Sequence, residues 1–271
     1  MELNNMNILN LEGSANCRDL GHTITKYGEV KNKKIIRSSQ LCNLSSNDIM
    51  HLEAYGVKKV IDLRGIRERE KAPDIKIESV INIHIPIFED LKIPVLNDWY
   101  IKKKFSEVQL LEEDLLQQKK RMMEIYRNFV EKQSSIKALK RIFRILVLNS
   151  TEGESVLFHC TMGKDRTGFV VALILSALGV EKDDIINDYL LTNKYLIKRI
   201  QIITAKLYDA GVSDNVIKYV HKYFLANEEY LEESFKIINM RYNSMNEFLS
   251  VQLGITDNQQ VALYDNYTRF C

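Results

Sequence analysis

One stretch of the sequence, Val156 to Gly168, holds the residues best suited to covalent chemistry. An apolar, strand-prone segment ends at Cys160, a short loop with one glycine follows, and a helix-compatible run begins at Arg166 or Thr167. Backbone N–H groups of such a loop converge on one point, and the free N–H groups of the helix start add positive charge there. The pattern predicts a phosphate-sized anion site with a cysteine at its base.

The residue types around Cys160 suit nucleophilic attack on phosphorus. The loop N–H groups, Lys164 and Arg166 all favour the thiolate, which is the nucleophilic form. Five residues separate Cys160 from Arg166, so the closed loop can direct the planar guanidinium back at two oxygens of the anion. Thr167 places a hydroxyl that can donate to the sulfur when it leaves. We expect phosphoryl transfer to Cys160 and hydrolysis of the phosphocysteine, with no metal or other cofactor. The expected phosphate-binding residues are Thr161, Met162, Gly163, Lys164, Asp165, Arg166 and Thr167.

Three other interpretations of Cys160 are weaker. A lone cysteine is usually a small buried apolar side chain, and Cys-x5-Arg also occurs in sulfur-transfer domains. Here the preceding His159, the glycine, the Arg-Thr-Gly exit and the apolar flanks agree with a phosphate loop. A zinc site at His159 and Cys160 does not fit, because no second Cys/His pair follows at ligand spacing.

The stretch from His159 to Gly168 resembles the phosphate loop of the cysteine-dependent protein tyrosine phosphatase superfamily. More narrowly, it is similar to the bacterial tyrosine and phosphoinositide phosphatases, whose loop reads His-Cys-x-x-Gly-Lys-Asp-Arg-Thr-Gly. Further matching blocks are Asn16–Gly21, Arg37–Leu41, Ile61–Arg64 followed by Glu68 or Glu70, and C-terminal Tyr-Leu and Leu-Gly-Ile fragments. The resemblance implies a tyrosine phosphatase-like fold and a phosphorylated protein or phosphoinositide as substrate. The supporting residues it implies are His159, Asn16, Arg18, Asp19 and Arg64.

The roles of these supporting residues are open. The resemblance places the N-terminal segment beside the loop, so Asn16, Arg18 and Asp19 either touch the site or form an internal network of hydrogen bonds and ion pairs. A buried strand, Val57 to Leu63, delivers Asp62 and Arg64 at its carboxyl end, where ligands of α/β sheets bind.

The proton donor is the least determined part of the site. Eukaryotic members of the superfamily carry a general-acid aspartate on a loop before the nucleophile, but this chain has no aspartate between Asp114 and Asp165. We therefore expect Asp165 to transfer protons, with Asp62 as second candidate. The alternative for Asp165 is to hold Lys164 or Arg166. The alternative for Asp62 is to pair with Arg18, Arg37 or Arg64.

The order of expected elements predicts an α/β fold with a central, mostly parallel sheet flanked by helices. We expect one domain over residues 1–271. A loop and helical insertion at 86–150 would cover the active site, and residues 181–271 would form a helical C-terminal layer. The segment with Pro94 and Trp99 is either this cover or a plain surface loop. Helical spacing predicts two or three helices over 107–149, broken near 132–135, and later helices at 185–192, 196–207 and 213–224.

Composition limits the partners. The 271 residues carry 38 basic and 36 acidic side chains, and this balance gives no argument for a nucleic-acid partner. Irregularly spaced cysteines indicate a reducing compartment. Neither a signal sequence nor a membrane-spanning run is recognisable, so we expect a cytoplasmic location, with export without a cleaved signal left open. We expect a monomer.

Three consecutive basic residues form either a solvated face or a transient contact with anionic lipid. They are Lys119, Lys120 and Arg121.

Lys164, four residues after the nucleophile, resembles phosphoinositide phosphatases, whose loops add positive charge for a multiply phosphorylated ring. The implied substrates are phosphotyrosine, phosphoserine or phosphothreonine, and phosphoinositides. Three alternatives remain: a phytate-type inositol polyphosphatase, a phosphate-binding module without turnover, and a Cys-x5-Arg sulfurtransferase or arsenate reductase.

Overall fold

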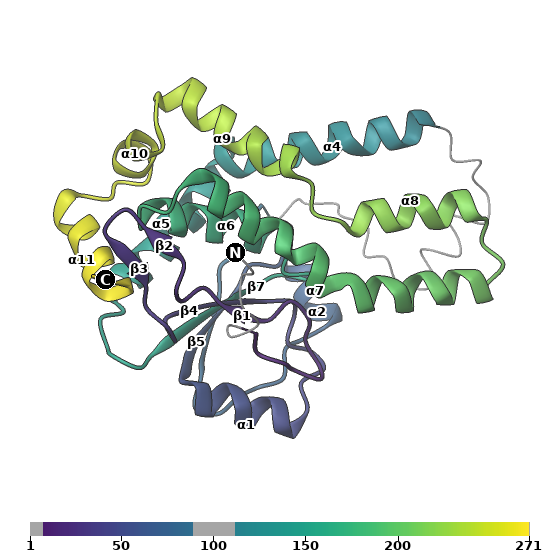
Figure 1. Ribbon diagram of the computed structural model, residues 1–271, viewed down its shortest axis with the longest axis horizontal. Coiled ribbons are helices and arrows are strands. Elements are labelled where there is room, and N and C mark those ends of the chain that lie inside the picture. Colours follow the sequence, from purple (N-terminus) through teal and green to yellow (C-terminus); the bar gives the residue numbers. More distant parts are fainter. Residues whose placement is uncertain (1–7, 89–111, 271) are drawn as a thin grey trace.

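The computed structural model describes residues 8–88 and 112–270, and its elements surround a central sheet (Figure 1). In the described part of the chain this sheet has five strands in the order β1-β4-β7-β5-β6. All neighbouring strands are parallel except β1, which pairs antiparallel with β4 at one edge. The predicted α/β class with a mostly parallel sheet is confirmed. The strands are β1 (Arg18–Asp19), β4 (Ile35–Ser38), β7 (Ser155–His159), β5 (Val57–Asp62) and β6 (Ile81–His84).

Helices cover both faces of the sheet, and a small second sheet joins the two ends of the chain. In Figure 1, α1 lies on one side of the strands, and α5 and α6 lie on the other. The second sheet is β2 (Ile24–Thr25), β3 (Gly28–Val30) and β8 (Thr268–Arg269). The helices are α1 (Ser46–Tyr55), α2 (Ile66–Lys71), α4 (Glu112–Glu131), α5 (Gln133–Leu148), α6 (Asp165–Ala177), α7 (Lys182–Asp209), α8 (Asp214–Phe224), α9 (Glu228–Tyr242), α10 (Met245–Glu247) and α11 (Asp257–Tyr267), with a π-helical turn at Phe248–Gln252.

The pleat of the central strands divides the core in two. Val156 and Phe158 of β7 point into the larger core, together with side chains of α4, α5, α6 and α9. Leu157, between them, points into a smaller core that includes Leu52 of α1. Successive side chains of a strand face opposite sides, so β7 is buried on both faces and is apolar without alternation. This central strand is the one that ends at the candidate nucleophile.

The helical insertion agrees with its predicted break. Two helices, α4 and α5, are separated at Lys132, inside the expected interval. Pro94 and Trp99 lie outside the described residues, and the expected cover over the site stays a prediction.

The C-terminal helices differ from the sequence prediction in one respect. The helices expected at 185–192 and 196–207 are one continuous helix, α7, so that boundary was wrong. No glycine or proline interrupts this stretch, and Asn193 uses its side chain to bond the backbone of Ala226 instead of ending the helix. Among the described residues, no helix combines the length and apolarity needed to cross a membrane.

An inner strand and an edge strand of the sheet predict different responses to truncation. Ile61 of β5 is fully buried in the larger core, whereas Ile81 of the neighbouring β6 is 61% exposed. We expect Ile61→Ala to lower the free energy of unfolding by about 2–5 kcal/mol because it leaves a cavity. Ile81→Ala should change it by about 0.5 kcal/mol or less. Urea unfolding followed by circular dichroism measures both, and equal losses would contradict this packing.

Candidate active site

The loop between β7 and α6 is held from behind by two side chains that are distant in sequence. Asn16 Nδ2 and Arg37 Nη2 each donate to the Gly163 carbonyl oxygen at 2.9 Å. The N–H and C=O groups of a peptide point in opposite directions, so carbonyls drawn toward the protein leave N–H groups for the other side. Cys160, at the base of this loop, is 2% exposed. The anion cradle that the sequence predicts at this loop stays a prediction.

Gly163 is required by the same close approach. Its φ is +64°, and a Cβ atom there would lie 2.3 Å from the Ser38 carbonyl oxygen. Both the left-handed backbone and the contact with β4 therefore exclude a larger residue.

Arg166 is buried and is paired with Glu68 of α2. Its Nη1 and Nη2 donate to the two carboxylate oxygens at 2.5 and 2.7 Å. Thr161 Oγ1 donates to the same carboxylate at 2.7 Å. Arg166 Nε has no hydrogen-bond partner in the described part of the chain. Glu68 therefore fixes the guanidinium and leaves N–H donors for an anion.

The pairing of Glu68 with Arg166 shifts the pKa of both side chains toward their charged forms. Burial alone would raise the pKa of Glu68, but the hydrogen bonds and charge of Arg166 lower it to about 2. Burial would lower the pKa of Arg166, and Glu68 together with Cys160 raises it above its usual value. Glu68 is one of the two carboxylates in the family resemblance, but its role was not predicted. The sequence feature that could have revealed this role is a glutamate at the third position of the helix that follows Asp62 and Arg64.

The second acid candidate, Asp62, is engaged in an ion pair. Its carboxylate accepts from Arg64 Nε at 2.9 Å and from Arg64 Nη2 at 2.8 Å. Burial would raise the pKa of Asp62, but Arg64 and the charge of His159 lower it. A carboxylate held ionised in this way is a poor proton donor. The geometry therefore favours the alternative role of Asp62, pairing with Arg64.

Asp74, which is partly buried, completes this group of charged side chains beside the nucleophile. Its Oδ2 lies 2.8 Å from Arg64 Nη2 and 3.0 Å from His159 Nε2. His159 Nδ1 lies 3.3 Å from the Cys160 carbonyl oxygen. Donor atoms of Asp62, Asp74 and His159 are within 4.8 Å of one another. The Arg64 guanidinium already supplies the positive charge between these carboxylates, so the group does not fit a metal ion. Sequence reasoning missed Asp74.

The N-terminal block divides between the two predicted roles. Asn16 touches the loop directly, whereas Arg18 pairs with Asp188 of α7, Nε to Oδ1, at 3.0 Å. Arg37 pairs with the same carboxylate. Asp19 accepts from the Gly21 N–H at 2.8 Å and from a tyrosine of α1, away from the loop. Arg18 and Asp19 thus belong to an internal network, and Asp188 is a member that the sequence did not reveal.

Lys164 contacts the end of α8. Its Nζ donates to the carbonyl oxygens of Tyr223 at 2.8 Å and Leu225 at 3.4 Å. The ammonium also lies 5.6 Å from the centre of the Tyr223 ring, and the residue is 4% exposed. A lysine at a helix C-terminus is favoured by the helix dipole. Contact with a substrate would require Lys164 to leave these carbonyls.

Asp165 and Thr167 lie in the first turn of α6. Asp165 Oδ1 accepts a hydrogen bond from the Tyr126 hydroxyl at 3.0 Å, and Oδ2 is 3.8 Å from Lys164 Nζ. Tyrosine, not the loop lysine, is therefore its hydrogen-bond partner. Thr167 is fully buried, and its hydroxyl has no partner among the described residues. Its predicted donation to the Cys160 sulfur stays a prediction.

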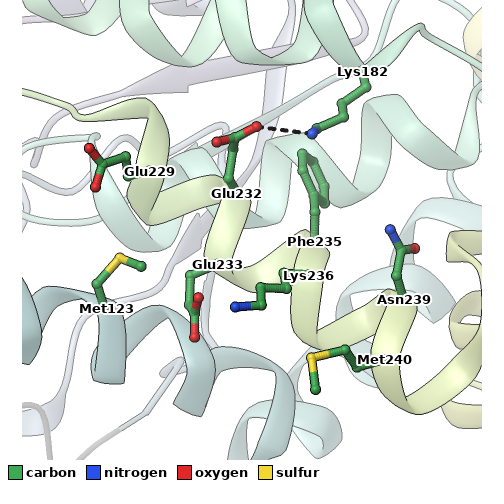
Figure 2. Close-up of a pocket in the computed structure, with 9 residues that line it drawn as sticks. All are labelled: Met123, Lys182, Glu229, Glu232, Glu233, Phe235, Lys236, Asn239 and Met240. Carbon is green, nitrogen blue, oxygen red and sulfur yellow. Dashed lines mark hydrogen bonds and ion pairs between the residues drawn. The ribbon is translucent and has the colours of Figure 1, made fainter.

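A separate groove of about 500 Å³ lies between α9, α4 and the start of α7 (Figure 2). Its lining includes three glutamates, each ion-paired with a basic residue. It contains none of the predicted site residues. The pairs are Glu229–Lys119, Glu232–Lys182 and Glu233–Arg127.

Comparison with known proteins agrees with the loop geometry. The sequence model described as the tyrosine phosphatase family matches residues 9–269. The chain belongs to the tyrosine phosphatase family. It is therefore a phosphatase, a hydrolase of phosphate esters.

Similar proteins are bacterial phosphatases. The chain is 28% identical over 267 residues to the triple specificity protein phosphatase PtpB of Mycobacterium tuberculosis, covering 90% of this chain and 93% of that protein. It is also 28% identical over 242 residues to a putative tyrosine-protein phosphatase of Cupriavidus necator, covering 89% and 82%. The match to a solved structure, TpbA of P. aeruginosa in complex with pTyr, covers 84% of this chain and 98% of that chain, at 12% identity and a TM-score of 0.29.

The Glu68–Arg166 pair predicts a defect with a defined pH dependence. Glu68→Gln should lower kcat/KM by about tenfold to 100-fold, because the guanidinium loses its fixed position. The pKa of Glu68 is lowered in the folded protein, so its stabilising contribution is present above about pH 4.5 and is lost as the pH falls toward 2. We expect a loss of at most about 3 kcal/mol in free energy of unfolding at pH 7, shrinking below about pH 5.

Urea unfolding at several pH values and steady-state kinetics measure these effects. Glu70→Gln is the matched control, because Glu70 lies exposed on the same helix. Equal behaviour of the two variants, or a difference in stability that grows as the pH falls, would contradict the assigned pairing.

Proposed function

We propose that this chain hydrolyses phosphate monoesters through a phosphocysteine at Cys160, acting on phosphotyrosine and phosphoinositides and also on phosphoserine or phosphothreonine. The observation that carries the proposal is the buried Cys160 at the end of β7, enclosed by a loop whose Arg166 is held by Glu68. A nucleophile, a fixed guanidinium and a set of backbone donors are the parts that phosphoryl transfer needs.

In the first step the Cys160 sulfur attacks phosphorus, and the bond from phosphorus to the ester oxygen breaks. Arg166 and the loop N–H groups bind the three non-bridging oxygens and stabilise their charge. Asp165 gives a proton to the departing oxygen. In the second step water attacks phosphorus, its proton passes to Asp165, and the sulfur leaves as a thiolate that Thr167 can stabilise. Phosphate is released, and the enzyme returns to its starting form.

The breadth of the substrate range rests on Lys164. The name of the M. tuberculosis relative, a triple specificity phosphatase, supports a broad range. In the structure, Lys164 bonds two neutral carbonyl oxygens, those of Tyr223 and Leu225. A second phosphate on the substrate is a stronger partner for an ammonium than neutral carbonyls are. We infer that a phosphoinositide draws Lys164 from α8 and that a phosphotyrosine peptide does not need to.

Rates of phosphate release in EDTA test this function. The substrates are a phosphotyrosine peptide, a phosphothreonine peptide and short-chain phosphoinositides. Cys160→Ser should be inactive on all of them, because a hydroxyl is not ionised at neutral pH. Lys164→Ala should lose about tenfold more activity on phosphoinositides than on the peptides. Lys140→Ala, on the exposed side of α5, is the control and should match the wild type.

The alternatives give different results. Preferential release from phytate would indicate an inositol polyphosphatase, and binding of phosphate without turnover would indicate a phosphate-binding module. Activity that EDTA abolishes, or that survives in Cys160→Ser, would exclude the proposed mechanism. Equal losses of Lys164→Ala on all substrates would leave the mechanism and exclude the role of Lys164 in specificity.

A further inference from the structure

Two tyrosines from different parts of the chain converge on Asp165. Tyr126 comes from α4 in the helical insertion and is 0% exposed, and Tyr189 comes from α7 and is 1% exposed. The Tyr126 hydroxyl donates to Asp165 Oδ1 at 3.0 Å and lies 2.8 Å from the Tyr189 hydroxyl. A buried tyrosine hydroxyl needs a partner, and these two find theirs in each other and in one carboxyl group.

Proton count fixes the direction of this chain of hydrogen bonds. A tyrosine hydroxyl has one proton, and that of Tyr126 points to Asp165. Tyr126 can therefore only accept in its bond with Tyr189, and Tyr189 must donate. The order is Tyr189 to Tyr126 to Asp165.

Packing holds both rings in place. The Tyr189 ring lies against Gly168 of α6, where an added Cβ atom would come within 2.7 Å of its Cδ2 atom. The Tyr126 ring packs among Phe129, Tyr189 and Tyr230, with ring centres 5.1, 6.4 and 5.8 Å away. Neither hydroxyl can move far without displacing core side chains. The hydrogen-bond chain is therefore a rigid support for Asp165.

The two oxygens of Asp165 have different partners. Oδ1 is occupied by Tyr126, whereas Oδ2 is 3.8 Å from Lys164 Nζ, beyond hydrogen-bond distance. Without the tyrosine donor, the carboxylate could turn and pair with Lys164. Tyr126 thus keeps Asp165 Oδ2 beyond hydrogen-bond distance of the Lys164 ammonium.

We propose that Tyr126 and Tyr189 are positioning residues that hold Asp165 so that Oδ2 passes its proton to the leaving oxygen of the substrate. As the bond from phosphorus to oxygen breaks, the proton moves from Oδ2 to that oxygen, and Asp165 becomes a carboxylate. Its bond from the Tyr126 hydroxyl strengthens with the new charge. This inference rests on the proposed function and adds the residues that make Asp165 its proton donor.

Leaving-group dependence tests the proposal, because only a poor leaving group needs a proton. Tyr126→Phe should lower kcat/KM for phenyl phosphate by about tenfold and for dinitrophenyl phosphate by less than about twofold. Asp165→Asn should show the same pattern with a loss of about 100-fold on phenyl phosphate. Tyr189→Phe should show a smaller loss in the same direction. Tyr126→Phe added to Asp165→Asn should cause no further selective loss.

Tyr267→Phe is the matched control, because it also removes a buried tyrosine hydroxyl, one that donates to the Leu146 carbonyl of α5. It should reduce stability without any dependence on the leaving group. Equal losses of Tyr126→Phe on both esters, no loss on either, or full additivity with Asp165→Asn would overturn this inference alone. If the wild type hydrolysed neither ester, the proposed function would fail, and this inference with it.

Discussion

The structure around the phosphate loop depends on the burial of one cation, Arg166. Transferring a guanidinium from water to the protein interior costs several kcal/mol unless an opposite charge and hydrogen bonds accompany it. Glu68 supplies both, and is itself fixed by the Gly65 N–H at 3.0 Å and by the Thr161 hydroxyl at 2.7 Å. α2 must therefore begin at the carboxyl edge of the sheet. This short helix carries no buried residue of its own, so its position follows from the ion pair and not from apolar packing.

A second set of charges supports the loop from the opposite side. Asp188 of α7 pairs with Arg18 and Arg37, and Arg37 also holds the Gly163 carbonyl. Burial would raise the pKa of Asp188, but the charges of both arginines lower it. Asn16 contacts both Gly163 and Arg18 and so links this network to the loop. The loop is thus fixed by charged groups on both sides, and its N–H groups are held in place before an anion arrives. Such preorganised donors are effective because no reorganisation is needed during the reaction.

The parts of the site that the sequence predicts are those that lie close together along the chain. Cys160 and Arg166 belong to one turn between a strand and a helix, so their residue types and spacing determine their geometry. Asp62 and Arg64 were placed at the correct strand end, and the structure identifies Arg64 as the partner of Asp62 among the three arginines that the sequence left open. Glu68, Asp188 and Tyr126 reach the site across 98, 151 and 39 residues of sequence, respectively, in their contacts with Arg166, Arg37 and Asp165. No local pattern encodes such contacts, because they depend on how the helices pack on the sheet.

The fold shows the same division between local and distant determinants. The apolar run of β7 and the break at Lys132 are local signals, and both agree with the structure. The continuity of α7 is not a local property. Asn193, in its middle, is a weak helix former, and its side chain bonds both the N–H and the carbonyl of Ala226 beyond α8. That tertiary contact stabilises the helix at a point where sequence alone indicates an interruption.

Glu68 and Asp165 have different kinds of hydrogen-bond partner. Glu68 contacts a buried cation through both oxygens, so neither oxygen is free and the group is committed to holding Arg166. Asp165 accepts from a neutral hydroxyl through Oδ1, and the Lys164 ammonium, 3.8 Å from Oδ2, also donates to two backbone carbonyls, so neutralising Asp165 does not leave that cation without a partner. A proton carrier needs that second arrangement, because a group that stabilises a fixed opposite charge cannot be neutralised cheaply. The tyrosines from α4 and α7 create this difference, which gives a structural reason for a helical insertion whose helix reaches the phosphate loop.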